Sequence, residues 1–292
     1  METSKNSSHN VFAPFLESFH AEYPSENTVA AYEYDFKDFA RWYAHTTGED
    51  LKPELVTELD LAEYRQYLMR KYKPSTVNRR LAAISKWLKW ANKEGILQRI
   101  PEMPKQVRQE KLAPRALTRS EQNALLRAVM REGKLRDQAI VYVLMYCGLR
   151  IGELVRLRVE DVELKRQGKI TVRNGKGDKT REVPAPANVR KVLQEYLGDR
   201  TSGRIFLGQR GPLTVRGVQE ILAKYAYKAR IECLSPHTLR HTCATNLLNK
   251  GVDLVKVAAI LGHENLNITA VYTRPSFDEL KKAVDIGDQE NN

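Results

Sequence analysis

SPHTLRHTCATNLLNKG, residues 235–251, is the stretch that decides the interpretation of this 292-residue sequence. Ser235 followed by Pro236 is typical of a helix start, and His237, Arg240 and His241 then follow at spacings that place them on neighbouring positions of one helix end. The same segment has apolar side chains that can face a core, namely Leu239, Ala244, Leu247 and Leu248. Free backbone N–H groups at a helix start favour anions, and an arginine adds a bidentate donor. The segment therefore predicts a phosphate site.

A metal site is the main alternative for this segment. His237 and His241, with Cys243 near them, offer three donor atoms, but the sequence completes neither an H-E-x-x-H motif nor a matched cysteine pair. Taken singly, each of these residues is better explained by a structural role. The sequence therefore predicts no metal, and the phosphate interpretation depends on further residues of the same kind.

Such residues occur in four other short motifs. They are GLRIGEL with Arg150, NGKGDK with Lys176, LGH with His263 and AVYTR with Tyr272. Together with HTLRH at 237–241, these motifs resemble the tyrosine recombinase, or lambda-integrase, family, in which two arginines, a lysine, two histidines and a tyrosine follow in this chain order. The resemblance covers the chain from Thr118 onward, is nearest to the compact Xer-like members, and shows no departure among these six residues.

The resemblance implies a covalent reaction on DNA that needs no cofactor, metal ion or ATP. Tyr272 would attack a phosphodiester, forming a 3′-phosphotyrosine link and releasing a 5′-hydroxyl. Arg150 and Arg240 would hold the non-bridging oxygens of the transition state. Lys176, in a hairpin turn, would give a proton to the leaving oxygen.

Other residues have supporting roles in the implied site. His237 and His263 would hydrogen-bond the phosphate or help to take the tyrosine proton. Lys179 lies in the same turn as the implied general acid and is the alternative to it, although the family's GKG pattern favours the earlier lysine. We expect Glu153 to orient the site rather than react, and His241 to support its neighbours or the fold.

The charge of the chain favours a nucleic-acid partner. The formal net charge is +12, and residues 105–292 carry +13 against −1 for residues 1–104. A helix expected over 73–95 also has basic side chains off its apolar stripe, at Arg79, Arg80, Lys86 and Lys89. We predict that these four contact DNA phosphates, the alternative being an ordinary solvated face.

Sequence patterns divide the chain into two domains. Residues 1–100 are predicted to form a helical core-binding domain that clamps DNA, residues 101–117 a proline-containing linker, and residues 118–292 the catalytic domain, with a tail from about 276. The fold class is mainly α with a small antiparallel β-sheet in the C-terminal domain, where two alternating runs flank the turn at 174–179. The resemblance implies the two-domain clamp of tyrosine recombinases.

Apolar periodicity and end signals give the expected helices. Before residue 25 we expect disorder. Helices are expected over 25–48, 59–72 and 73–95, over 118–130 with a capping box of Thr118 and Glu121, and over 135–147, which is apolar nearly all round and therefore predicted to be buried.

Composition excludes several classes of protein. The three cysteines are odd in number and lack a C-x-x-C pair, which argues against a disulfide framework. The longest apolar run, at 139–147, is far shorter than a membrane span, and the polar N-terminus has no signal-peptide core. We therefore expect a cytoplasmic protein with no membrane contact.

The resemblance implies a site-specific DNA recombinase that cuts and rejoins strands through a Holliday junction. It would act on double-stranded DNA recombination sites as a homotetramer, with a monomer free in solution; the sequence names no accessory protein. The tail has a short apolar stripe that would dock on a neighbouring subunit or fold on its own domain, formed by Phe277, Leu280 and Ala283 or Val284. The alternatives are a type IB-like DNA topoisomerase, a non-catalytic DNA-binding protein and a metal-dependent nuclease.

Overall fold

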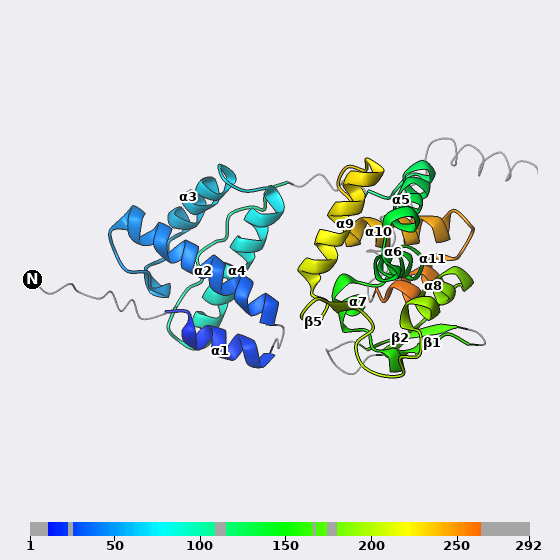
Figure 1. Cartoon of the computed structure of the whole chain (residues 1–292). Coiled ribbons are helices and arrows are strands. Elements are labelled where there is room, and N and C mark those ends of the chain that lie inside the picture. Colours follow the sequence, from blue (N-terminus) through cyan, green and yellow to red (C-terminus); the bar gives the residue numbers. More distant parts are fainter. Residues whose placement is uncertain (1–10, 23–25, 109–114, 166–167, 174–179, 264–292) are drawn as a thin grey trace, which may run out of the picture. The chain divides into compact units, whose positions relative to one another are not determined.

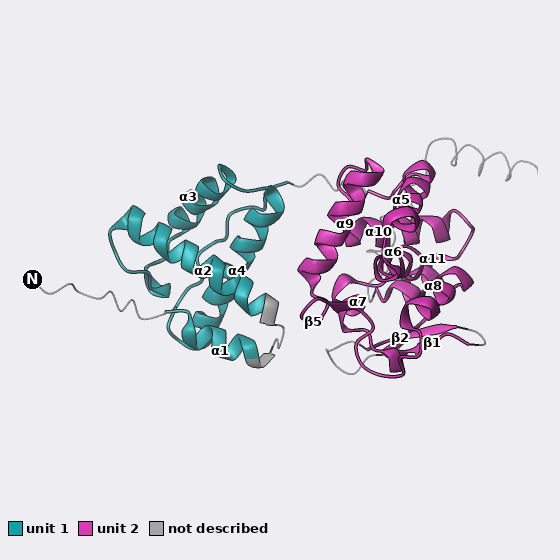
Figure 2. Cartoon of the chain, in the orientation of Figure 1, with its two compact units in different colours: residues 1–111 teal, residues 112–292 magenta. Residues whose placement is uncertain are grey.

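The computed structural model describes residues 11–22, 26–108, 115–165, 168–173 and 180–263. The chain forms two compact units, unit 1 with residues 1–111 and unit 2 with residues 112–292 (Figure 2). The division lies inside 101–117, the segment that we interpret as a linker. Both units are mainly helical, and the strands of the described residues belong to unit 2 (Figure 1). The predicted fold class, mainly α with a small antiparallel sheet in the C-terminal domain, is confirmed.

Unit 1 packs helices around an aromatic core. Its described elements are α1 (Ala13–Glu22), α2 (Glu26–Thr47), the 3-10 helix η1 (Pro53–Leu55), α3 (Glu58–Met69) and α4 (Pro74–Lys93). The apolar stripe expected for α4 is buried, and Trp87 beside it is fully buried; the stripe consists of Val77, Leu81, Ile84, Leu88 and Ala91. Pro74 at the first helical position has the backbone angle that a helix start requires. The helices expected in this part of the chain are therefore confirmed.

The expectation of disorder before residue 25 is wrong for α1. Phe12, Phe15 and Phe19 follow at steps of three and four residues and are all buried. The ring of Phe12 stacks on Phe36 with centroids 4.5 Å apart and lies 4.7 Å from the ring of Trp87. Burying one phenylalanine side chain stabilises a fold by about 2 to 3 kcal/mol. Three such side chains explain why a segment with polar neighbours is helical.

Unit 2 is built around α6, which contacts α5, α8, α9 and α10 (Figure 1). The described elements are α5 (Arg119–Glu132), α6 (Leu135–Cys147), α7 (Ile151–Arg156), the 3-10 helix η2 (Val159–Asp161), β1 (Val162–Glu163), β2 (Lys169–Arg173), β3 (Thr180–Pro184), α8 (Ala187–Leu197), β4 (Leu207–Gly208), β5 (Gly211–Pro212), α9 (Val215–Ala229), α10 (Pro236–Leu248) and α11 (Leu254–Leu261). The predicted burial of the 135–147 helix is confirmed. The predicted capping box is also present, since Thr118 Oγ1 accepts from Glu121 N–H at 3.2 Å and the Glu121 carboxylate accepts from Thr118 N–H at 2.8 Å.

The predicted hairpin is present as the antiparallel pair β2 and β3, and β1 adds a third strand beside β2. Val172 pairs with Arg181 and Ile170 with Val183 in the register of β2 and β3. Ile170 and Val183 are fully buried, so one face of the hairpin covers the core of unit 2. None of the helices in the described part of the chain has the length and apolar character needed to cross a membrane.

Candidate active site

The start of α10 places the HTLRH motif as the sequence predicts. Ser235 is the N-cap, and its Oγ accepts from the backbone N–H of Thr238 at 3.1 Å, while Pro236 occupies the first turn. His237 is exposed and lies one helical turn before His241, with ring centroids 6.4 Å apart. The predicted helix start is confirmed, and it holds both histidines on one face.

Arg240 lies on the same helix, between the two histidines in sequence, and is buried. The residue is 4% exposed, and its guanidinium donates to Gly148 O at 2.5 Å and to Leu261 O at 2.6 Å. Gly148 has a positive φ of 62°, and a Cβ there would lie 2.6 Å from Cδ2 of Leu261. The glycine therefore permits the close approach that brings both carbonyl groups to one guanidinium.

Arg150 begins α7 immediately after the turn at Gly148. Its backbone N–H donates to Glu153 Oε2 at 2.8 Å, its Nη1 donates to Glu153 Oε1 at 3.0 Å, and its Nη2 donates to Gly262 O at 2.7 Å. The side chain is 40% exposed, in contrast to the buried Arg240. Arg150 is thus anchored by its protein partners and still open to solvent on one side.

Two histidines of the site are held neutral. Burial, together with the positive charges of Arg240 and Arg150, lowers the pKa of His263 to about 4. Burial, His237 and Arg240 together lower the pKa of His241 to about 4. At physiological pH both imidazoles can therefore accept hydrogen bonds.

Glu153 lies beneath Arg150 and binds a second arginine that the sequence analysis missed. Arg181 on β3 donates through Nη1 and Nη2 to the two carboxylate oxygens of Glu153, both at 2.8 Å. Burial alone would raise the pKa of Glu153, but hydrogen bonds from Arg181 and Arg150 hold the pKa below its usual value. The orienting role expected for Glu153 stays a prediction, and its contacts support it. The missed signal was a charged residue on the same strand face as the buried Val183.

The structure therefore brings together the described members of the predicted catalytic set. These are Arg150, His237, Arg240 and His263, with His241 and Glu153 beside them. Lys176, the alternative Lys179 and Tyr272 lie outside the described residues, as do the tail positions Phe277, Leu280, Ala283 and Val284. Within the described residues no group of three or more His, Cys, Asp or Glu side chains is arranged to hold a metal ion.

The cations of α4 differ from one another in burial. Arg79, Lys86 and Lys89 are exposed, and Arg79 forms an ion pair with Asp35. Arg80 is 2% exposed, and its guanidinium pairs with Asp38 and Asp35.

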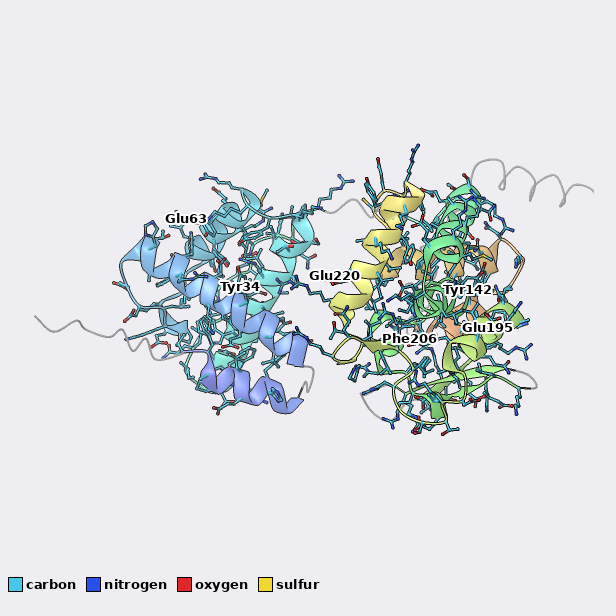
Figure 3. All side chains as sticks on the ribbon, viewed as in Figure 1. Tyr34, Glu63, Tyr142, Glu195, Phe206 and Glu220 are labelled. Carbon is cyan, nitrogen blue, oxygen red and sulfur yellow. The ribbon has the colours of Figure 1, made fainter. Side chains whose placement is uncertain are left out.

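Aromatic rings complete the surroundings of Arg80. Its guanidinium carbon lies 4.1 Å from the ring centroid of Tyr72 and 5.5 Å from that of Tyr34, which is labelled in Figure 3. The burial and the two carboxylate partners argue against the expectation that Arg80 contacts DNA.

Two family models match this chain. The phage integrase family model matches residues 115–279, and the model of the phage integrase N-terminal SAM-like domain matches residues 14–95. The tyrosine recombinase XerC of Pelobacter propionicus is 35% identical over 270 residues that cover 89% of each chain. The tyrosine recombinase XerA of Pyrococcus furiosus is 32% identical over 283 residues, which cover 94% of this chain and 91% of that protein.

Solved structures with the same fold include recombinases bound to DNA. The XerH site-specific recombinase in a pre-cleavage complex with its difH substrate aligns with a TM-score of 0.72 at 22% identity, over 93% of this chain and 83% of that one. A lambda integrase dimer on a COC′ core site aligns with a TM-score of 0.74 at 16% identity, over 92% and 97% of the two chains. The family models and the identity to the two curated relatives show that this chain belongs to the phage integrase family of tyrosine recombinases.

Proposed function

We propose that this protein recombines two duplex DNA sites by cutting and rejoining strands through a covalent 3′-phosphotyrosine bond to Tyr272. The observation that carries the proposal is the pair of guanidinium groups of Arg150 and Arg240, which are bound to the consecutive carbonyls of Gly262 and Leu261. The next residue is His263, an imidazole held neutral. Two fixed cations can stabilise the negative charge that builds up on the phosphate oxygens during attack, and a neutral base beside them can take the proton of the nucleophile.

The chemistry conserves the energy of the DNA backbone. The Tyr272 oxygen forms a bond to phosphorus as the bond from phosphorus to the 5′-oxygen breaks, so one phosphate ester replaces another. In the second step a 5′-hydroxyl attacks the phosphotyrosine and releases the tyrosine. Each step exchanges one ester bond for an equivalent one, so no ATP is consumed, and in this proposal the positive charge that a metal ion could supply comes from Arg150, Arg240 and Lys176.

Arg150 and Arg240 differ in burial, and we therefore give them different roles in the proposed reaction. The five-coordinate transition state carries more negative charge on its non-bridging oxygens than the diester does. Arg240 is buried and hydrogen-bonded to two carbonyl oxygens, so it contributes a positive charge that is fixed in place. Arg150 is anchored on one side and 40% exposed, and its open side can bind a phosphate oxygen. Such preorganised donors typically contribute about 3 to 4 kcal/mol each to transition-state binding.

Proton transfer belongs to Lys176 and the histidines in this proposal. Lys176 gives a proton to the leaving 5′-oxygen, with Lys179 as the alternative. Because its pKa is about 4, His263 is neutral at physiological pH and therefore accepts a hydrogen bond or proton from the attacking tyrosine. His237 is exposed at the start of α10 and binds a phosphate oxygen. His241 supports these two rings.

The DNA partner is proposed from charge and from the complexes of related folds. The net charge of +12 favours a polyanion, and the exposed Arg79, Lys86 and Lys89 of α4 offer phosphate contacts in unit 1. We propose a homotetramer on two sites, because strand exchange through a Holliday junction needs four active sites, and a reaction in the cytoplasm, where such DNA is present. The relatives named above are recombinases, so they do not favour a topoisomerase or a binding protein without activity.

A nicked suicide substrate tests the proposed chemistry. The duplex carries the sequence that the protein selects from a pool of random duplexes, and a nick near the cleavage site lets the 5′-hydroxyl fragment leave. We expect a covalent protein–DNA band on a denaturing gel in the presence of a chelator and without ATP. Tyr272→Phe should bind the same DNA with unchanged affinity and give no band, because the nucleophilic oxygen is missing.

Two results would contradict the proposal. A band that persists in Tyr272→Phe would show that another residue is the nucleophile. Cleavage that is lost in chelator would favour a metal-dependent nuclease.

A further inference from the structure

The C-terminal end of α11 binds three arginines on three consecutive carbonyl oxygens. Arg181 Nε donates to Ile260 O at 3.1 Å, Arg240 Nη2 to Leu261 O at 2.6 Å, and Arg150 Nη2 to Gly262 O at 2.7 Å. The last carbonyls of a helix have no partner within it and carry the negative end of its dipole, so cations are stabilising there. Two of the three arginines have roles in the proposed reaction, whereas the third, Arg181, has none so far.

Arg181 is bound to the protein through each of its three side-chain nitrogens. Nε binds the carbonyl of Ile260, and the two Nη atoms bind the two oxygens of Glu153 in a bidentate pair. Its side chain is only 12% exposed. Arg181 is therefore poorly placed to contact a phosphate itself, in contrast to Arg150, which is 40% exposed.

The turn before His263 lies directly on the Arg181 guanidinium. A Cβ at Gly262 would lie 2.9 Å from Cδ, Nε and Cζ of Arg181, closer than real side chains approach. Gly262 also has a positive φ of 67°, and the N–H of His263 donates back to Ala258 O at 3.0 Å. The backbone turn that precedes His263 is thus packed closely against the Arg181 side chain.

We propose that Arg181 is a positioning residue of the active site. It joins β3 to Glu153, and through the shared carboxylate to Arg150, while its Nε holds the end of α11, where Arg240 and His263 lie. Without Arg181, Glu153 in α7 and Ile260 in α11 would each lose the hydrogen bonds that Arg181 donates to them. This inference rests on the proposed function, because it supposes that Arg150, Arg240 and His263 act on the phosphate.

The position of Arg181 on a paired strand makes this role physically effective. Arg181 pairs with Val172 in the β2 and β3 ladder, and Val183, two residues further along β3, is buried in the core. A guanidinium fixed on a strand transmits that rigidity to the groups that it binds. A displacement of reacting groups by about 1 Å lowers a rate by about 100-fold.

The test measures single-turnover formation of the covalent adduct on the nicked duplex described above, with protein in excess and at a temperature where every variant is folded by circular dichroism. Arg181→Gln should slow the adduct by about 10- to 100-fold, with the DNA dissociation constant unchanged. Arg181→Lys keeps the charge but can replace only one of the three nitrogens, so it should restore part of the rate. The matched control is Glu182→Gln on the same strand, whose exposed pair with Lys169 leaves the site untouched.

A second readout separates positioning from general stability. Arg181 is among the cations that lower the pKa of His263, after burial, Arg240, Arg150 and His241. In Arg181→Gln the pKa of His263, followed by NMR of its ring, should therefore rise above about 4. It should stay unchanged in Glu182→Gln.

The outcomes distinguish this inference from the proposed function. If the wild type forms the adduct and Arg181→Gln forms it at the same rate, Arg181 has no positioning role and the proposed chemistry stands. A rate loss that disappears when the folded fraction is taken into account would also overturn the inference. If the wild type forms no adduct although it binds the duplex, the proposed function itself fails.

Discussion

Replacing Glu153 by glutamine removes the one carboxylate that Arg150 and Arg181 share. Glu153 is 5% exposed and accepts four hydrogen bonds, two from Arg181 at 2.8 Å and two from Arg150 at 2.8 and 3.0 Å. A glutamine keeps one acceptor oxygen and turns an amide donor toward two cations. The substitution is nearly the same size, so the change is electrostatic rather than steric.

The contacts give the expected size of the effect. A hydrogen bond to a charged group contributes about 1.5 to 3 kcal/mol, and at least two of the four are lost. Removing one partner of a buried ion pair costs about 3 to 5 kcal/mol, because the other charge stays buried. Arg181 is 12% exposed and meets that condition, whereas Arg150 is 40% exposed and can turn toward water. We therefore expect the free energy of unfolding of unit 2 to fall by about 3 kcal/mol.

The positions of the tryptophans allow each unit to be followed separately. All three, Trp42, Trp87 and Trp90, belong to unit 1, so tryptophan fluorescence follows unit 1 alone. Far-ultraviolet circular dichroism follows the helices of both units. With a urea dependence of about 2 kcal/mol per molar, Glu153→Gln should lower the midpoint of unit 2 by about 1.5 M and leave the fluorescence transition in place.

A control variant and the pH dependence of stability test this expectation. Glu182→Gln removes the carboxylate of an exposed pair and should cost less than about 0.5 kcal/mol. The folded pKa of Glu153 lies below its ordinary value of 4.5, so the stability that it contributes is present above pH 4.5 and is lost as the pH falls through the folded pKa. The deficit of Glu153→Gln should therefore shrink in acid. A midpoint equal to that of Glu182→Gln at pH 7 would refute the reasoning.

Two further predictions concern the histidines and Arg80. His241 and His263 have folded pKa values of about 4, below the ordinary 6.5. The stability of unit 2 should therefore fall as the pH drops from 6.5 toward 4, and it should fall less steeply in His263→Gln. Urea midpoints that do not change over this pH range would contradict the prediction. Arg80→Met leaves the Asp35 and Asp38 carboxylates without their buried partner and should destabilise unit 1 by about 3 to 5 kcal/mol, seen in tryptophan fluorescence. Lys89→Gln, by contrast, should leave the fluorescence transition unchanged and lower the slope of log affinity against log salt by about 1. The reverse pattern would show that Arg80, not Lys89, meets DNA.

Local signals in the sequence predicted the elements whose causes are local. The capping box of Thr118 and Glu121, the N-cap of Ser235 and the buried helix over 135–147 each depend on residues within a few positions of one another. The hairpin of β2 and β3 follows in the same way from two alternating runs around a glycine-rich turn. Such features need no knowledge of the rest of the fold.

Arg80 and Arg181 show where sequence reasoning stops. Arg80 lies three residues after Val77 and four before Ile84, so its helical position is on the buried side of α4, and classifying it by charge alone hid this. The spacing could have revealed it. Arg181 is 28 residues from Glu153 and 79 from Ile260, and no local pattern announces which carboxylate and which helix end it will meet. Those contacts arise only when the strand, the α7 start and the α11 end come together in the fold.

In the proposed reaction, the charge at the end of α11 explains how the site would favour the transition state over the bound substrate. Three guanidinium groups meet there, of which two bind the single carboxylate of Glu153, so a protonated His263 would add a further positive charge to a half-buried place. The low pKa of His263 follows from that burial and those cations, and in the proposed reaction the neutral ring can accept a proton. The phosphodiester is less negative than the five-coordinate state that follows it, so the attraction to the excess positive charge grows as the reaction proceeds. Because the hydrogen bonds to three carbonyls hold these cations before DNA arrives, little reorganisation is needed at the moment of attack.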